Sequence, residues 1–396
     1  MKYINKNKNK RRICVFTGTR ADYGLLKWTM HELLKDNRVT LQVIASGTHF
    51  SKEFGMTYKE IEKDGFSIDC KVDLNIFKDD SVNIARIIGY GTKKFSLALK
   101  NLKPDIIVIL GDRYEALAMA QSAMIMKIPL AHIHGGESTE GAIDEAIRHS
   151  ITKMSHIHFT SADLHKKRVI QMGEKPENVF NTGAPGLDNI SKLKLLSKKE
   201  LEKILQTKFK ENIFLVSYHP ATLDTNDTLE PLKSIFEVLK KIYDSTIILS
   251  KSNADSGGLK INKYLEELTL QNKDIILRPS YGQLIYLSIL KQASLIIGNS
   301  SSGIIEAPYL GTPTLNIGNR QLGRLRAPSV IDSSISTKEI YKKTQESLSK
   351  KFQIISKECV SPFGLPGASK KISKKLIEIN LDGILYKKFY DIKGAA

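Results

Sequence analysis

The densest group of ionisable side chains in the sequence lies between residues 131 and 149, in the segment AHIHGGESTEGAIDEAIRH. It includes the carboxylates of Glu137, Asp144 and Glu145 and the guanidinium of Arg148. Carboxylates and imidazoles can accept and return protons, and neighbouring glycines let a ligand approach the backbone closely. The segment is therefore a candidate site for acid–base chemistry.

An ordinary helix start is the alternative interpretation of this segment. Acidic residues in the first turn suit the helix dipole, and Asp144 stands four residues before Arg148, which is the spacing of a helical ion pair. That interpretation explains one or two of the acids. It does not explain why several acids gather beside His132, His134 and a pair of glycines.

Apolar segments on both sides position these residues. The run from 128 to 133 predicts a buried strand, and apolar residues at 143, 147, 151 and 154 predict a helix. The ionisable groups thus lie in the turn between a strand and a helix, which is where open α/β sheets bind ligands.

The same arrangement occurs twice earlier in the chain. The apolar run 104–110 predicts a central parallel strand that ends before Asp112 and Arg113, and a strand at 13–16 ends before a turn containing Arg20. Arginine beside glycine and small hydroxyl residues suits a phosphate. A helix cap at Asp112 and a surface ion pair at Arg20 are the alternatives.

The second half of the chain repeats this alternation, with strands predicted at 213–217, 246–250 and 293–298. His219 follows the first of these strands, and three serines and Gly303 follow the last. Hydroxyls and free amides at a helix start favour a phosphate, because the helix dipole attracts anions. A serine that only caps the helix would explain one of the three.

Alternating strands and helices throughout predict the α/β class, with two Rossmann-like doubly wound domains facing each other across a cleft. A lysine-rich helix from residue 197 onward indicates the passage between the domains. We therefore expect a first domain at 1–190 and a second at 191–365.

Composition narrows the class of protein. The 396 residues suffice for two full cores, and a hydrophobic fraction of 41% is ordinary for a soluble protein. Three scattered cysteines predict neither a disulfide framework nor a metal site. No apolar run is long enough to span a membrane, and the basic N-terminus lacks the apolar core of a signal peptide, so we expect a cytoplasmic protein.

The net charge of +18 raises the possibility of a nucleic-acid partner. Most of this charge is lysine along helical segments, without interleaved aromatic residues or a known recognition motif. An anionic small molecule accounts for the charge as well as a polyanion does. We expect no nucleic-acid partner and no membrane partner.

Six motifs follow one another in the chain: Gly18-Thr19-Arg20, Gly111-Asp112-Arg113, His132-Ile-His134-Gly-Gly-Glu137, Asp144-Glu145-Ala-Ile-Arg148-His149, His219-Pro220 and Gly298-Asn-Ser-Ser-Ser-Gly303-Ile-Ile-Glu306-Ala-Pro308. This ordered set resembles the UDP-N-acetylglucosamine 2-epimerase family, from about residue 12 to about residue 380. Non-hydrolysing members carry Gly-Thr-Arg-Pro-Glu, where this chain has Ala21-Asp22 after the arginine. The sequence therefore resembles the hydrolysing branch.

The resemblance implies a glycosyltransferase-B type fold in which the segment 366–396 forms a C-terminal helix that crosses back to the first domain. It also implies that UDP leaves a UDP-sugar to give a 2-acetamidoglucal. Water then adds at C1 while a proton reaches C2 from the opposite face. We expect this reaction to use no cofactor and no metal, and we expect a homo-oligomer, either a dimer or a tetramer.

Inverting C2 requires acid–base groups on both faces of the sugar ring. The resemblance implies Asp112, Glu137 and Asp144 for this role, with Glu145 as the substitute for Asp144. His219 joins the catalytic residues at the departing diphosphate. The expected substrate-binding residues, which would contact the diphosphate, the ribose or the sugar, are Arg20, Lys27, Arg113, Arg148, Asn253, Ser301, Ser302, Gly303 and Glu306.

Two substrates stay open, because the sequence does not define the substituents at C4 and C6 of the sugar. UDP-N-acetylglucosamine would give N-acetylmannosamine for the sialic acid-like sugars of surface polysaccharides. UDP-2,4-diacetamido-2,4,6-trideoxyglucose would belong to the legionaminic acid pathway. A glycosyltransferase of the same fold, a nucleotide-sugar sensor and a nucleic-acid-binding protein are the alternative functions, and the three carboxylates favour the epimerase over the transferase.

Overall fold

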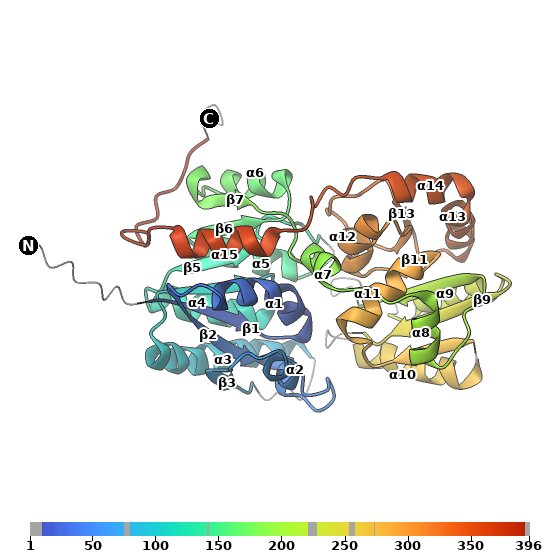
Figure 1. Ribbon diagram of the computed structural model, residues 1–396, viewed down its shortest axis with the longest axis horizontal. Coiled ribbons are helices and arrows are strands. Elements are labelled where there is room, and N and C mark those ends of the chain that lie inside the picture. The colour runs from blue at the N-terminus through green and yellow to red at the C-terminus, as the bar shows by residue number, and fades with distance from the viewer. Residues whose placement is uncertain are drawn as a thin grey trace, which may run out of the picture.

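The computed structural model describes residues 10–74, 80–140, 142–220, 228–252, 258–272 and 274–392. These residues form two domains that lie next to each other along the long axis of the molecule (Figure 1). Each domain is a parallel β-sheet with helices on both faces, so the expected α/β class with two doubly wound domains is confirmed.

The sheet of the first domain has the strand order β3-β2-β1-β4-β5-β6-β7, and every neighbouring pair is parallel. Its strands are β1 (Arg11–Thr17), β2 (Val39–Ser46), β3 (Cys70–Val72), β4 (Ile106–Leu110), β5 (Leu130–Ile133), β6 (Ile157–Thr160) and β7 (Val179–Asn181). All five residues of β4 are apolar and buried, as expected for a central parallel strand covered on both faces.

The sheet of the second domain has the order β10-β9-β8-β11-β12-β13, again with parallel neighbours. Its strands are β8 (Asn212–Ser217), β9 (Ser245–Ser250), β10 (Ile275–Arg278), β11 (Leu295–Gly298), β12 (Thr314–Ile317) and β13 (Val330–Ser333). The edge strand β13 was not predicted, because its sequence VIDS offers only two apolar residues and none of its first three residues is fully buried.

Helices cover both faces of each sheet and form a separate apolar core with each face. Those of the first domain are α1 (Arg20–Leu34), η1 (Gly47–Phe50), α2 (Tyr58–Lys63), α3 (Ser81–Leu102), α4 (Tyr114–Ile125), α5 (Asp144–Met154), α6 (Asp163–Gln171) and η2 (Pro176–Asn178). Those of the second domain are α8 (Lys198–Leu205), α9 (Glu230–Leu239), α10 (Gly258–Gln271), α11 (Gly282–Gln292), α12 (Ser301–Leu310), α13 (Thr337–Leu348) and α14 (Lys350–Glu358).

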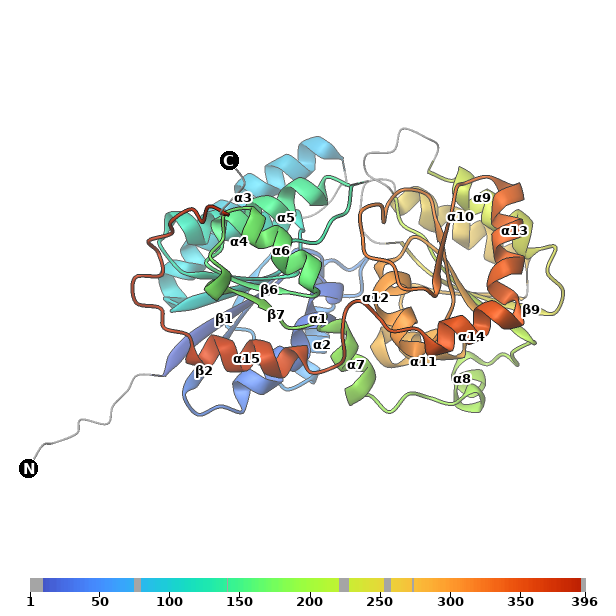
Figure 2. The ribbon, with the colours of Figure 1, turned by 90° about the horizontal axis from the view of Figure 1, so that it is seen from above.

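Two further helices connect the domains. The short helix α7 (Gly186–Lys192) lies at the junction, and α15 (Ala368–Glu378) follows the second domain but packs against α1 of the first, as Figures 1 and 2 show. Asp188 on α7 accepts hydrogen bonds from the backbone N–H groups of Gly367 and Ser369, the latter at 2.6 Å. The junction helix therefore anchors the start of α15.

A local capping interaction explains why helix α1 begins earlier than the sequence pattern predicts. The sequence pattern predicts the first helix from residue 25, but α1 begins at Arg20, because the Thr19 side chain accepts a hydrogen bond from Asp22 N–H. The turn after β1 is correspondingly shorter, so Arg20 lies on the first turn of a helix instead of in a loop. Among the described residues, no helix is both long and apolar enough to cross a membrane.

Candidate active site

The predicted site residues gather where the strand order of each sheet reverses. In the first domain the reversal falls between β1 and β4, whose carboxyl ends lead to Gly18 and Asp112. In the second domain it falls between β8 and β11, which lead to His219 and Ser300. Ligands of doubly wound sheets bind at such switch points, because the helices leave in opposite directions there.

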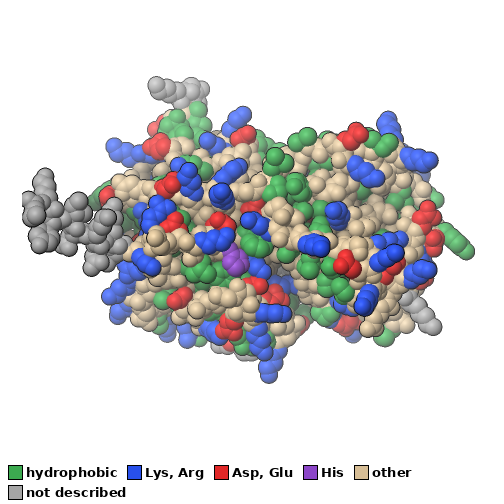
Figure 3. Space-filling view, in the orientation of Figure 1, with side chains coloured by type: hydrophobic (Ala, Val, Ile, Leu, Met, Phe, Trp, Pro, Cys, Tyr) green, Lys and Arg blue, Asp and Glu red, His purple; other side chains and the backbone are tan. Residues whose placement is uncertain are grey.

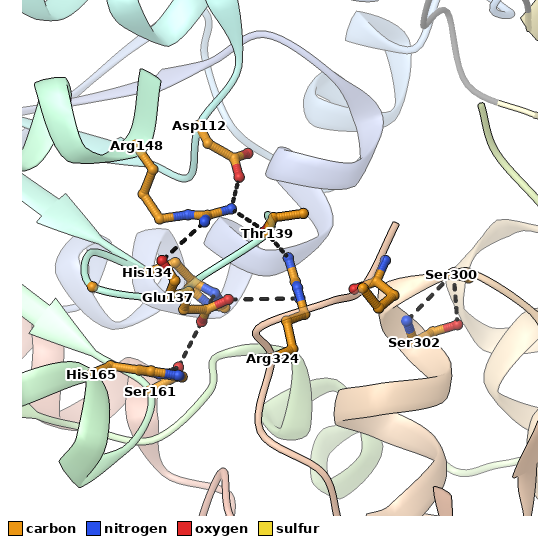
Figure 4. A network of polar contacts seen from close by, with 12 residues as sticks. Asp112, His134, Glu137, Thr139, Arg148, Ser161, His165, Ser300, Ser302 and Arg324 are labelled. Atoms are coloured by element: carbon orange, nitrogen blue, oxygen red, sulfur yellow. Dashed lines mark hydrogen bonds and ion pairs between the residues drawn. The ribbon is translucent and has the colours of Figure 1, made fainter. Parts of the chain in front are cut away.

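Arg148 is the central cation of the first-domain site, with an exposed fraction of 1%. Its guanidinium forms ion pairs with Asp112 and, at 3.1 Å, with Glu145, and it donates to Thr139 Oγ1 at 2.9 Å and to the Glu137 carbonyl at 3.0 Å. Burial lowers the pKa of Arg148. The arginine therefore ties the turn after β4 to the loop between β5 and α5 (Figure 4).

Glu137 is buried to an exposed fraction of 2%, and charged or hydroxyl groups engage both of its oxygens. His134 Nδ1 lies 2.7 Å from Oε1, Ser161 Oγ donates to the same oxygen at 2.6 Å, and Arg324 Nη1 lies 3.6 Å from Oε2. Burial alone would raise the pKa of Glu137, but the contact with His134, followed by Arg324 and His165, holds this pKa well below its ordinary range. Glu137 is therefore an anion.

Backbone conformation fixes the loop that carries these groups. His134 has φ +69°, in the left-handed region that side chains other than glycine seldom adopt. Gly136 has φ +77°, and a Cβ there would collide with the carbonyl of His165 on α6. Gly136 thus lets the loop pass close against α6, while His134 holds a strained conformation of the kind found at functional sites.

The two adjacent acids at the start of α5 have different environments. Glu145 accepts hydrogen bonds from Ser138 Oγ at 2.9 Å and from Thr139 N–H at 2.5 Å, besides its contacts with Arg148 and His149. These partners lower its pKa against the opposing effect of burial. Asp144 is the first residue of the helix and is half-buried.

The ion pair suggested by helical spacing is not the one that Arg148 forms. Arg148 pairs with Asp112, which is distant in sequence, and with Glu145, three residues before it, instead of with Asp144. The reason is the length and direction of its side chain, which points across the sheet edge toward β4 instead of along the helix.

A second acidic group lies at the start of α1. Burial raises the pKa of Asp22 to about 6, and Glu115 beside it is fully buried and paired with Arg113 at 3.4 Å. Arg20 stands on the first turn of α1, and burial lowers its pKa. Lys27, one of the predicted binding residues, forms an ion pair with Asp64 at 2.7 Å.

The serine turn of the second domain begins α12. Ser300 is the N-cap, and its Oγ lies 3.1 Å from Ser302 Oγ, which also bonds to the hydroxyl of Tyr286. Ser301 is the first residue of the helix. A Cβ at Gly303 would lie 2.8 Å from a methyl group of Thr314, so this glycine lets α12 pack directly onto β12.

His219 is held beside this turn through its backbone. Its N–H donates to Asn299 Oδ1 and its carbonyl accepts from Asn299 Nδ2, both at 2.8 Å. One turn further along α12, burial raises the pKa of Glu306 to about 7, and a Cβ at Gly186 would lie 2.6 Å from its carboxylate. Glu306 therefore lies against the junction helix α7.

The two halves of the site meet through the loop 318–326 of the second domain. Arg324 reaches Glu137, as described, and its Nη2 lies 3.5 Å from Thr139 Oγ1. The backbone N–H of Glu140 donates to the carbonyl of Leu322 at 3.1 Å. Figure 4 shows Arg324 between the first-domain network and the serine turn.

The structure thus brings most of the predicted site residues to the two facing sheet edges. Asn253 lies outside the described residues. Sequence reasoning did not assign roles to His134, Ser161, Tyr286 and Arg324. His134 and Arg324 stood in segments already marked by their histidines and arginines, whereas Ser161 and Tyr286 had no signal, because only folding brings them to the site.

The distribution of surface charge and the placement of metal-ligating side chains bear on the alternative functions. Figure 3 shows lysine and arginine side chains scattered over this face of both domains among acidic ones, without a continuous basic band. Within the described ranges, no three or more His, Cys, Asp or Glu side chains are grouped as metal ligands. The visible face therefore offers no track for a nucleic-acid backbone.

Comparison with known proteins identifies the family. The sequence model of the UDP-N-acetylglucosamine 2-epimerase family matches residues 31–377. The chain is 42% identical over 386 residues to the GDP/UDP-N,N'-diacetylbacillosamine 2-epimerase (hydrolyzing) of Campylobacter jejuni, covering 97% of this chain and 100% of that protein. It is 38% identical over 389 residues to the polysialic acid biosynthesis protein P7 of Escherichia coli, covering 96% and 98%.

The fold matches as well. A crystal structure of UDP-GlcNAc 2-epimerase from Neisseria meningitidis bound to UDP-GlcNAc superimposes with a TM-score of 0.79 at 22% identity, covering 93% of this chain and 100% of that one. The chain belongs to the UDP-N-acetylglucosamine 2-epimerase family. The family, the fold and the enzyme class predicted from the motifs, a hydrolysing UDP-sugar 2-epimerase, are confirmed.

Proposed function

We propose that the substrate of this enzyme is UDP-2,4-diacetamido-2,4,6-trideoxyglucose, which is UDP-N,N'-diacetylbacillosamine, and that the products are UDP and the free 2-epimeric sugar. The 42% identity to a relative named for that sugar, over nearly the whole length of both chains, supports this choice. UDP-N-acetylglucosamine, giving N-acetylmannosamine, is the second candidate, supported by the 38% identity to a polysialic acid biosynthesis protein.

The chemistry sets the demands on the site. The hydrogen at C2 of a hexosamine is weakly acidic, because no carbonyl adjoins that carbon. It becomes removable only as the C1–O bond to the diphosphate breaks and positive charge develops on the ring. The site must therefore stabilise the departing diphosphate and also hold acid–base groups beside the sugar.

The two domains divide these tasks. Asp112, Glu137 and Asp144 in the first domain would surround the sugar, while Arg20, His219 and the serine turn would hold the diphosphate. The amides and hydroxyls at the start of α12 suit an anion. Glu306 would accept hydrogen bonds from the ribose hydroxyls.

Of the two adjacent acids on α5, Asp144 is the better candidate for direct catalysis. Glu145 accepts from Ser138 and Thr139 and pairs with Arg148 and His149, so its oxygens already maintain the loop. Asp144 would therefore serve one ring face.

The observation that carries the assignment of the site is the contact between Arg324 and Glu137. It places the acidic cluster of the first domain beside the loop that follows β12 of the second. A substrate whose two ends need opposite chemistry, an anionic diphosphate and a sugar with a proton to lose, fits this juxtaposition.

Incubation with each UDP-sugar in heavy water, without any acceptor, tests the proposal. We expect UDP release and a free sugar that carries deuterium at C2, faster from the diacetamido substrate than from UDP-N-acetylglucosamine. A product that forms only when an acceptor is added would indicate a glycosyltransferase. Faster turnover of UDP-N-acetylglucosamine would reverse the choice of substrate.

Carboxylate variants test the assigned residues. Asp112→Asn, Glu137→Gln and Asp144→Asn should each lose turnover far more than UDP affinity, by about 100-fold or more. Asp105→Asn is the matched control. Asp105 lies just before β4, and Asp112 lies just after the other end of the same strand. Full turnover in all three site variants would refute the assignment.

A further inference from the structure

Glu137 is poorly placed to exchange a proton with the substrate itself. Its Oε1 faces His134 Nδ1 at 2.7 Å and accepts from Ser161 at 2.6 Å, and its Oε2 faces Arg324. Only 2% of the residue is exposed. A buried anion engaged at both oxygens gains little by taking up a proton, so a neighbouring group is the better carrier.

His134 is that neighbour. It is 7% exposed, and its Nε2 atom is buried without a hydrogen-bond partner among the residues that the structure describes. Buried polar atoms seldom lack a partner, so this nitrogen calls for an explanation, and a catalytic role or a bound molecule is one. The left-handed backbone of His134 adds a strain that a purely structural histidine would not need.

The contact with Glu137 determines which ring nitrogen carries the hydrogen. An ionised carboxylate can only accept, so Nδ1 must donate to it. In the neutral ring, Nε2 then keeps its lone pair and is a base. A carboxylate behind an imidazole fixes this tautomer and stabilises the cation that forms when the ring takes a proton.

The position of His134 suits contact with the sugar. It follows β5 directly, next to β4, whose carboxyl end leads to Asp112. Figure 4 shows His134 and Glu137 on the side of the first-domain network that faces Arg324 of the second domain.

We propose that His134 is a catalytic base of this enzyme, with Nε2 taking the proton from C2, and that Glu137 acts through it as a positioning residue. This inference rests on the proposed function, because it takes the carboxylate-lined edge as the place of the sugar. As the C1–O bond breaks, its electron pair leaves with UDP. The C2–H pair becomes the C1–C2 double bond, and the proton forms an N–H bond on Nε2.

The second half of the reaction needs a different proton donor. Water adds at C1 of the 2-acetamidoglucal, and the proton that reaches C2 comes from the opposite ring face. His134 releases its proton to solvent before the next turnover. Loss of the imidazole should therefore impair formation of the glucal more than its hydration.

His134→Asn is the sharpest variant, because asparagine tolerates the left-handed backbone and its amide can still donate to Glu137. It removes only the ring atoms that carry Nε2. We expect UDP release to fall by about 100-fold or more, while hydration of added 2-acetamidoglucal in the presence of UDP falls by less than about tenfold. The Kd for UDP and the midpoint of thermal unfolding should match those of the wild type.

His156→Asn is the control. His156 is 8% exposed and accepts from Leu130 N–H, but it precedes β6 at the opposite end of the sheet. Its variant should keep UDP release within about threefold. The double variant His134→Asn/Glu137→Gln should lose no more than the worse single variant, because groups that act as one unit are not additive.

Several outcomes would overturn the proposal. UDP release by His134→Asn within threefold of the wild type would do so, and so would equal losses in both half-reactions. Additive losses in the double variant would also contradict it, as would an unfolding midpoint lowered enough to account for the lost activity. Failure of the wild type itself to release UDP and a C2-deuterated sugar would instead refute the proposed function. The two failures are therefore distinguishable.

Discussion

Arg324 of the second domain places its Nη1 atom 3.6 Å from Oε2 of Glu137 in the first. The loop that carries it also accepts a backbone hydrogen bond from Glu140 at the Leu322 carbonyl. The approach of the two domains therefore brings a guanidinium to a buried carboxylate. That charge helps to lower the pKa of Glu137, so a residue of the second domain affects the protonation state of the first-domain site.

Replacing Arg324 should show how much its positive charge contributes to activity. Arg324→Gln removes the charge from beside Glu137, and we expect kcat/KM to fall by about 10- to 100-fold, the value of one or two charged contacts. Arg324→Lys restores a positive charge and should recover part of the loss. Arg278→Gln is the control: Arg278 is a partly exposed arginine of the same domain that donates to the Ile204 carbonyl, and its loss should leave kcat/KM unchanged. Steady-state kinetics with the UDP-sugar decide between these outcomes.

Arg148 offers a test of stability. Arg148→Met would leave Asp112 and Glu145 without their shared buried cation, and we expect the free energy of unfolding to fall by about 3–5 kcal/mol. Arg12→Met is the matched control, because the Arg12–Asp105 pair is 42% and 36% exposed and should contribute about 0–1 kcal/mol. Urea unfolding followed by circular dichroism measures both. A similar loss in the two variants would show that burial of Arg148 is not what matters.

The sequence predicted which residues lie at the carboxyl edge of each sheet better than it predicted which of them contact one another. Apolar runs locate β4 and β11, and the carboxyl ends of parallel strands must share one edge, so Asp112 and the serine turn were expected to belong to the site. Helical spacing suggested Asp144 as the partner of Arg148. Arg148 pairs instead with Glu145, three residues before it, and with Asp112 in the turn after β4, and no local pattern indicates the second of these partners.

The same limit applies to the junction between the domains. A lysine-rich helix indicated where the first domain ends, but the contacts that fasten the domains come from Asp188 on α7 and from the loop with Arg324. Tyr286 meets Ser302 only because α11 packs beside α12. Such pairs depend on tertiary packing, which hydrophobic periodicity does not specify.

The serine turn should affect binding more than turnover. Ser302→Ala removes the hydroxyl that contacts Ser300 and Tyr286 at the start of α12, and we expect the Kd for UDP to rise about tenfold, about 1.4 kcal/mol, with kcat nearly unchanged. Isothermal titration with UDP measures the change. Ser96→Ala, on the exposed surface of α3, is the control. An unaltered Kd together with a lower kcat would move Ser302 from binding to catalysis.

Glu174 anchors the C-terminal segment and should govern stability in acid. Its carboxylate lies 2.6 Å from Lys153 Nζ, 3.0 Å from His158 Nε2 and 2.8 Å from Lys387 Nζ. Burial acts to raise its pKa, but the contacts with His158 and then with the two lysines outweigh burial and lower the pKa from 4.5 to about 2. Because the folded pKa lies below the unfolded value, the stabilisation is complete above pH 4.5 and disappears as the pH falls toward 2.

Glu174→Gln should therefore be less stable than the wild type at pH 7, by about 3 kcal/mol, and the difference should shrink as the pH falls from 4.5 to 2. Urea unfolding across that range measures the two slopes. Glu177→Gln, whose side chain is 68% exposed beside Lys175, should follow the wild-type curve within about 1 kcal/mol. A Glu174→Gln curve parallel to that of the wild type would contradict the prediction, because a neutral side chain at this position cannot lose the same proton-linked stabilisation.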